Sequence, residues 1–127
     1  GGLGVFSTTT TITRTTFSGN QGPQGAAINA QGSALTISNS TFSGNQGTST
    51  SSDGAAIFHF ANGQAMTLTN CTFSGNINPS NFGGGDALVA DNLASYRNTI
   101  FSGQSPQISG AGASSLGNNI CSGGTAA

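Results

Sequence analysis

The pentapeptide Thr-Phe-Ser-Gly-Asn occurs three times in this chain, and a fourth, altered copy follows. The copies lie at residues 16–20, 41–45 and 72–76, and the altered one, TIFSGQ, lies at 99–104. Their phenylalanines are separated by 25, 31 and 28 residues. Recurrence of one motif at a period between about 20 and 50 residues is typical of a repeat architecture. The chain is therefore predicted to consist of similar stacked units.

Each unit has two recognisable halves. The first half is GAAI at 25–28 and 54–57, with the variant DALV at 86–89. The second half is an alternating segment that leads into the pentapeptide, at 10–20, 35–45 and 66–76. Leu3 precedes Phe17 by 14 residues, as Ile28 precedes Phe42, so the first residues are predicted to form a further copy.

Alternation along a strand decides which side chains face the interior. In the alternating segments the apolar residues occupy every second position, so they lie on one side of the strand. Tyr96 takes the same place in the fourth copy. The phenylalanines of successive units are expected to stack on one another. The predicted core stack comprises Phe17, Phe42, Phe73, Phe101, Ile12, Ile37 and Leu68.

A corner is required between Ile37 and Phe42. Both are expected to face the interior, but one straight strand would place them on opposite sides because one number is odd and the other even. The residues at this place in three units are Asn39, Asn70 and Asn98, while Arg14 takes the place in the first unit. Asparagine tolerates left-handed backbone geometry and bonds to nearby backbone. Identical asparagines stacked on successive coils can also form an amide ladder. A corner ladder of asparagines is therefore predicted.

Composition restricts the class of protein. Charged residues make up 4% of the 127 residues, with no Lys and no Glu, against about 25% in ordinary domains. Nucleic-acid binding needs many cations, so this partner is not expected. No apolar run approaches the ~20 residues of a membrane-spanning helix. Glycine, at 21 residues, disfavours helices, whereas Thr, Ile and Phe favour strands. With no initiator Met and no signal peptide, the chain is expected to be a mature or excised piece.

These patterns predict an all-β fold, a right-handed parallel β-helix of about four to five coils that forms one domain over 1–127. The expected coil boundaries are 1–24, 25–53, 54–85, 86–107 and 108–127.

The paired motifs also resemble a known family. GAAI with FSGN, at 25–28 with 42–45 and at 54–57 with 73–76, is similar to the GGAI and FxxN pairs of polymorphic outer-membrane protein repeats. These repeats belong to secreted bacterial right-handed β-helix proteins. The resemblance implies a secreted or surface-exposed protein, often adhesive, and it names no ligand. The sequence departs from the pattern at Ala26 and Ala55, in the DALV copy, and at Gln104.

Catalytic, metal and cofactor sites are not expected. Polysaccharide lyases and glycosidases need clustered carboxylates, whereas this chain has three aspartates, Asp53, Asp86 and Asp91, which are interpreted as loop or corner residues. His59 has no partner acid and is interpreted as structural. A carbohydrate-active β-helix remains an alternative.

Phe58 and Phe60 fall at positions whose side chains are expected to point outward. Either the loop at 46–53 covers them or they form an exposed contact patch. Cys71 falls in the column of Thr15, Ser40 and Thr99, about two coils from Cys121. That separation exceeds the reach of a disulfide unless the C-terminal segment folds back, and both the free and the paired state remain open.

The outward positions carry Thr and Ser on successive coils. Columns of this kind resemble ice-binding solenoids, although Thr is also a favourable outward strand residue and Arg97 interrupts the pattern. The sequence favours a non-enzymatic extracellular module that acts in adhesion to a host or surface glycan or protein, or in end-to-end self-assembly. Ice or crystal binding is the other alternative.

Overall fold

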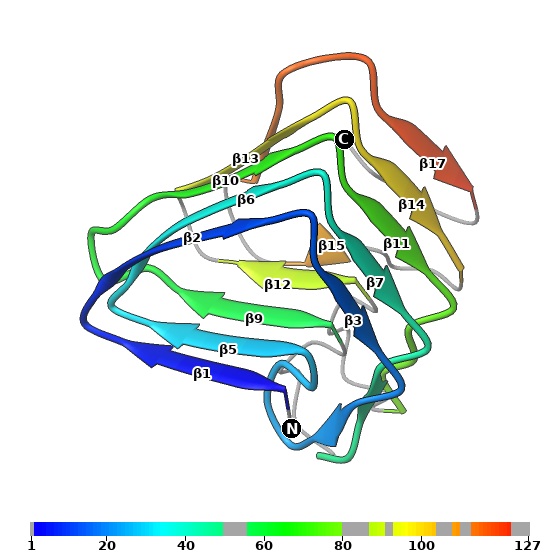
Figure 1. Ribbon diagram of the computed structural model, residues 1–127, viewed down its shortest axis with the longest axis horizontal. Coiled ribbons are helices and arrows are strands. Elements are labelled where there is room, and N and C mark those ends of the chain that lie inside the picture. Colours follow the sequence, from blue (N-terminus) through cyan, green and yellow to red (C-terminus); the bar gives the residue numbers. More distant parts are fainter. Residues whose placement is uncertain are drawn as a thin grey trace.

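The chain winds through five layers of strands around one axis, with a triangular outline (Figure 1). The computed structural model describes residues 2–49, 56–79, 87–90, 93–103, 108–109 and 113–122. Within these ranges there are strands and turns and no helix, and every pairing between strands is parallel. The predicted all-β parallel β-helix is therefore confirmed.

Each coil contributes one strand to each of three sheets, which form the three faces. The first sheet contains β1 (Leu3–Phe6), β5 (Ile28–Gln31), β9 (Ile57–Phe60), β12 (Leu88–Ala90) and β15 (Ile108–Ser109). The second contains β2 (Thr9–Thr13), β6 (Ala34–Ser38), β10 (Met66–Thr69), β13 (Ala94–Arg97) and β16 (Ser114–Ser115). The third contains β3 (Thr16–Ser18), β7 (Thr41–Ser43), β11 (Thr72–Ser74), β14 (Ile100–Ser102) and β17 (Ile120–Ser122). Two short strands, β4 (Gln21–Gly22) and β8 (Gln46–Gly47), pair beside the third sheet.

The four phenylalanines of the repeated motif form one column inside the third sheet. Phe17, Phe42, Phe73 and Phe101 pair in register, and successive ring centroids lie 5.2, 4.6 and 5.1 Å apart. The last three are fully buried, whereas Phe17, in the outermost coil, is half-buried. Tyr96 packs edge-on against Phe101 at 5.3 Å. A continuous ring stack therefore lines one wall of the interior.

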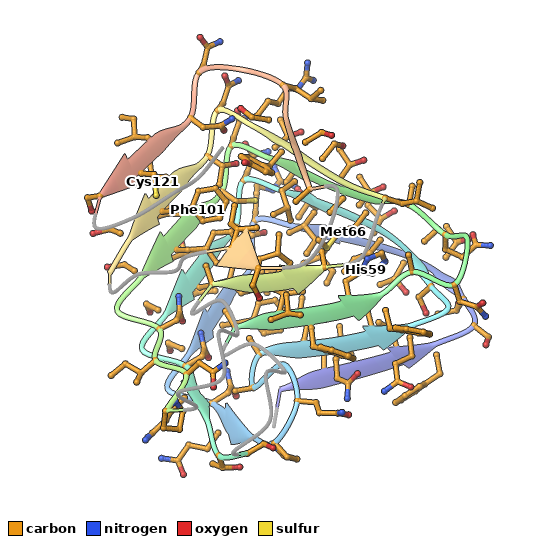
Figure 2. All side chains as sticks on the ribbon, turned by 180° about the vertical axis from the view of Figure 1, so that it is seen from behind. His59, Met66, Phe101 and Cys121 are labelled. Atoms are coloured by element: carbon orange, nitrogen blue, oxygen red, sulfur yellow. The ribbon has the colours of Figure 1, made fainter. Side chains whose placement is uncertain are left out.

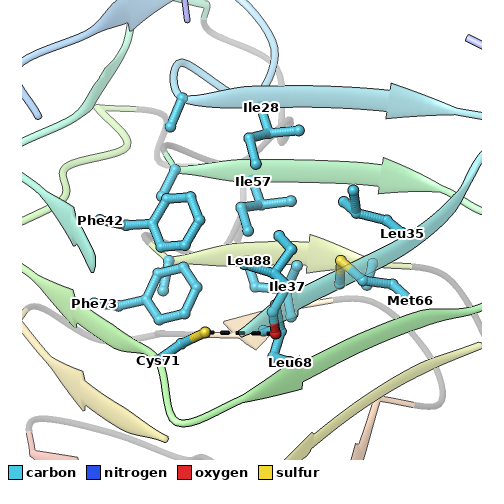
Figure 3. Packing of buried hydrophobic residues seen from close by; sticks show 14 of the residues in the cluster. Ile28, Leu35, Ile37, Phe42, Ile57, Met66, Leu68, Cys71, Phe73 and Leu88 are labelled. Atoms are coloured by element: carbon cyan, nitrogen blue, oxygen red, sulfur yellow. Dashed lines mark hydrogen bonds between the residues drawn. The ribbon is translucent and has the colours of Figure 1, made fainter. Parts of the chain in front are cut away.

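Aliphatic residues of the other two sheets complete the interior (Figure 3). Ile12, Ile37, Leu68 and Tyr96 form a column of the second sheet, and Ile28, Ile57 and Leu88 form one of the first. All of these side chains are buried. Six of the seven predicted core residues are therefore buried, and Phe17 packs against them at the edge of the stack. Successive coils present apolar side chains at matching positions because their registers match.

The corner after the second sheet has left-handed backbone. Asn39, Asn70 and Asn98 have φ of 52°, 54° and 49°, and Arg14 has 50° in the first coil. The Asn70 side chain donates to Asn39 Oδ1 at 3.1 Å, and Asn98 donates to Asn70 Oδ1 at 3.0 Å. These asparagines are exposed, so the corner ladder runs along the outside of the stack.

A second asparagine ladder, which the sequence analysis missed, lies inside the corner after the third sheet. Asn45 is fully buried and donates its Nδ2 to Asn76 Oδ1 at 2.9 Å and to the Phe17 carbonyl at 3.1 Å. Its own Oδ1 accepts the backbone N–H and the Nδ2 of Asn20. Asn45 and Asn76 therefore each satisfy backbone groups of the preceding coil.

The glycine of the GAAI half is explained by a close approach of two coils. A Cβ added at Gly25 would collide with the Ile28 carbonyl oxygen and lie 2.7 Å from the Phe58 backbone nitrogen. Gly25 also has a φ of +49°, which side chains rarely adopt. The turn into β5 therefore requires glycine at this position.

Candidate functional site

The outer faces of the second and third sheets are lined by hydroxyl side chains. Thr11, Thr36 and Thr67 pair in register on the second sheet, and Thr16, Thr41 and Thr72 do so on the third. The columns do not continue as threonine through the stack, because Ser95 follows on the second sheet and Ile100 on the third. These two faces present short hydroxyl arrays with interruptions.

The outer face of the first sheet is different, since it exposes aromatic rings. Phe6, Gln31 and Phe60 occupy one outward column on three successive coils. Phe6 is 60% exposed and Phe60 is 54% exposed. Phe58, in the neighbouring outward column, is half-buried. Of the two predicted patch residues, Phe60 is thus exposed, and its aromatic partner is Phe6, which the sequence analysis did not single out.

A groove of about 270 Å³ lies between these rings. We call it the Phe6–Phe60 groove, and its lining residues are Phe6, Ser7, Gln31, Gly32, Phe60 and Asn62. The first coil supplies Phe6 and Ser7, and the third coil supplies Phe60 and Asn62. The second coil, which lies between them, supplies Gln31 and Gly32. The groove therefore exists because the second coil carries glycine, Gly32, at the corner.

Backbone geometry at this corner holds the groove open. Ser7, Gly32 and Asn62 follow the three strands, and all have left-handed φ, at 49°, 59° and 43°. Ser7 N donates to the Gln31 carbonyl at 3.0 Å, and Gly32 N donates to the Phe60 carbonyl at 2.8 Å. Because the ladder continues through the turn, both rims of the groove are tied to its floor.

A row of carboxamides crosses the face next to the groove. Gln31 Nε2 donates to Asn29 Oδ1 at 3.2 Å, and Asn29 Nδ2 donates to Gln24 Oε1 at 3.4 Å. This chain of bonds orients Gln31 along its own strand. Among the described residues the Gln31 side chain makes no other hydrogen bond, so its Oε1 and one N–H remain available for a ligand.

Two further hollows adjoin the groove and share residues with it. One, of about 360 Å³, lies on the other side of Phe6 and is lined by that ring, Asn29 and the turn from Gln21 to Gly25. The other, of about 380 Å³, continues around the corner and is lined by Ser7, Thr8, Thr9, Gly32 and Gln64. None of the residues described as lining the three hollows is charged. Together they form an uncharged band around the first coils.

His59 lies beneath this face, inside the core (Figure 2). It pairs in register with Ala30 and Ala90, whose small side chains leave room for the imidazole ring. Nε2 lies 3.0 Å from the Ser33 carbonyl oxygen and donates to it, while Nδ1 has no partner within the described residues. A fully buried ring cannot contact a ligand in the groove, so its placement agrees with a structural role.

Neither Cys71 nor Cys121 forms a disulfide bond. Cys71 is buried in the corner column, and its thiol donates to the Thr69 carbonyl at 3.4 Å, as the hydroxyls of Ser40 and Thr99 donate to the carbonyls two residues before them. Its thiol also lies 3.8 Å from the Ile37 carbonyl (Figure 3). Cys121 pairs with Phe101 and so extends the ring column instead (Figure 2). Of the two predicted alternatives, the structure has the one without a disulfide bond. Burial raises the pKa of the Cys71 thiol above its ordinary value, against the backbone hydrogen bonds that lower it.

In the part of the chain that the structure describes, no group of three or more His, Cys, Asp or Glu side chains could hold a metal ion. Asp53, Asp86 and Asp91 lie outside the described residues. In the same part of the chain, no helix is long and apolar enough to cross a membrane.

Comparisons of the chain with protein-family models, with curated proteins and with solved structures found no match.

Proposed function

We propose that this chain is a non-enzymatic structural module of a secreted or surface-exposed bacterial protein, and that it acts in adhesion. The observation that carries the proposal is the pair of exposed rings, Phe6 and Phe60, on either side of a groove. Exposed apolar groups gathered at one place mark sites of interaction. On the first three coils the outer faces of the second and third sheets carry mainly Thr and Ser, so the first sheet is the face that offers aromatic contacts there.

The stacked coils suit this role because they present the groove on a rigid support. The lining residues lie at the ends of paired strands or just after them, and the corner itself is hydrogen-bonded. Binding groups held by regular elements lose less conformational freedom on association than groups on long loops. The likeness of the GAAI and FSGN motifs to repeats of secreted β-helix proteins supports the extracellular location.

Adhesion can be tested with beads that carry the purified chain. Beads are washed over immobilised polysaccharides, cell-wall fragments and extracellular proteins, and the retained fraction is counted. We expect retention on at least one surface and its loss in the double variant Phe6→Ala/Phe60→Ala. Absence of retention on every surface would refute the proposal, and release of sugar products would favour the carbohydrate-active alternative. Thermal hysteresis of the same sample tests ice binding.

A second candidate is end-to-end association through the first coil. Its strands β1, β2 and β3 each lie at the edge of their sheet, and Leu3 and Phe17 are half-buried there. An open parallel edge can pair with strands of another copy, and such head-to-tail contacts propagate as filaments. Light scattering over a concentration series should then show growing particles, whereas a constant monomer mass would rule this candidate out.

A further inference from the structure

The two exposed rings of the groove lie in one column with a single coil between them. Because neighbouring parallel strands are about 4.8 Å apart, Phe6 and Phe60 are separated by roughly 10 Å along the axis of the stack. The faces of sugar rings carry C–H groups that pack against aromatic rings, while the hydroxyls at their rims need hydrogen-bonding partners. Two rings that flank a carboxamide match this alternation of apolar face and polar rim.

Polar groups converge on the floor of the groove where no side chain fills the space. A Cβ placed at Gly32 would lie 3.5 Å from Ser7 Oγ and 3.9 Å from Asn62 Nδ2. Gln31 also lines the groove, and its carboxamide, which donates one N–H to Asn29, has an Oε1 and a second N–H left for a ligand. Hydroxyl and carboxamide groups each donate and accept, as the hydroxyls of a sugar do.

The charge of the lining restricts the ligand further. No described residue that lines the groove or its two neighbours is charged. An acidic polysaccharide would require Arg or Lys partners. A stable protein interface buries about 800 Å² on each partner around an apolar centre, whereas the centre here is Gln31 and Gly32. An uncharged ligand rich in hydroxyls therefore fits better than an anionic one or a protein.

We infer that the Phe6–Phe60 groove binds a neutral glycan chain, with sugar rings packed on Phe6 and Phe60 and their hydroxyls bonded to Gln31, Ser7 and Asn62. The inference rests on the proposed adhesive function and names its ligand class. The neighbouring hollows, which share Phe6 on one side and Ser7 with Gly32 on the other, extend the site to an oligosaccharide longer than the groove itself.

Isothermal titration with a panel of neutral oligosaccharides (glucans, mannans, galactans and N-acetylglucosamine oligomers) tests the inference, with polygalacturonate as the acidic comparison. We expect at least one neutral ligand to bind, longer oligomers to bind more tightly, and Phe6→Ala/Phe60→Ala to weaken binding at least tenfold. Gln31→Leu, which keeps the size of the side chain, should also weaken it severalfold.

Ile120→Ala is the matched control, because Ile120 is 61% exposed and lies on the third sheet, away from the groove. Its affinity should equal that of the parent chain, and unfolding midpoints verify that all variants fold. The inference is overturned if no neutral glycan binds, if polygalacturonate binds equally well, or if the double variant keeps its affinity. Retention of beads on a protein surface without glycan binding would overturn the ligand class and leave adhesion standing.

Discussion

At the scale of single residues, the same amino acid serves different purposes at the two kinds of corner. Asn39 is exposed and left-handed, so its main contribution is tolerance of a positive φ. Asn45 is fully buried and bonds to neighbours on both sides in the stack. The buried ladder is therefore expected to matter far more for stability than the exposed one.

Replacing Asn45 with Ala should lower the free energy of unfolding by about 2–4 kcal/mol, because each orphaned buried polar group costs about 1–3 kcal/mol. Asn39→Gly is the control, since glycine accepts the left-handed φ, and it should cost no more than about 1 kcal/mol. Urea denaturation measures both. Similar losses in the two variants would show that the buried ladder has no special weight.

Stability should also fall at high pH. Burial, and secondarily Cys121, raises the pKa of Tyr96 above its ordinary value of 10.0, and burial raises the pKa of the Cys71 thiol above 9.0. Both groups are neutral when protonated, so the unfolded chain loses these protons first. The stabilisation is complete below the unfolded pKa values and is lost as pH rises above about 9 and through the raised folded pKa values.

Urea midpoints at about pH 8 and about pH 10.5 check this expectation. Tyr96→Phe should reduce the loss at the higher pH, since Tyr96 is the single tyrosine. A midpoint that rises with pH over this interval would contradict the assigned directions.

At the scale of strands, alternation in the sequence was sufficient to predict the inward columns. The spacing of the phenylalanines fixed which residues pair, and the break in parity between Ile37 and Phe42 located the corner. Alternation along a strand does not say where a corner side chain points, which is why the buried ladder of Asn45 was not predicted. Phe6 was missed for a related reason, because its partnership with Phe60 is made across two coils and not along one strand.

The inward and outward columns should differ sharply in their sensitivity to truncation. Phe73 packs between Phe42 and Phe101 and is fully buried, so Phe73→Ala should cost about 3–5 kcal/mol. Thr36 is exposed on the second sheet, and Thr36→Ala should change stability by no more than about 0.5 kcal/mol. Chemical denaturation of both variants provides the comparison, and equal effects would overturn the distinction between inside and outside.

At the scale of the whole molecule, in-register pairing of the strands of successive coils aligns the repeated residues in continuous columns. One register aligns the core rings, the two asparagine ladders and the Phe6–Phe60 groove, although their residues are far apart in the chain. A coil that slipped by one residue would turn its core side chains outward and also separate the residues that line the groove. Fold and proposed binding site therefore depend on the same alignment.

Nuclear Overhauser contacts between protons of neighbouring coils measure this alignment most directly. We expect contacts from Gln31 to both Phe6 and Phe60, and from the Phe73 ring to the rings of Phe42 and Phe101, all with parallel backbone patterns. Contacts of Gln31 with neither phenylalanine, or antiparallel patterns between coils, would contradict the stacked register and with it the groove.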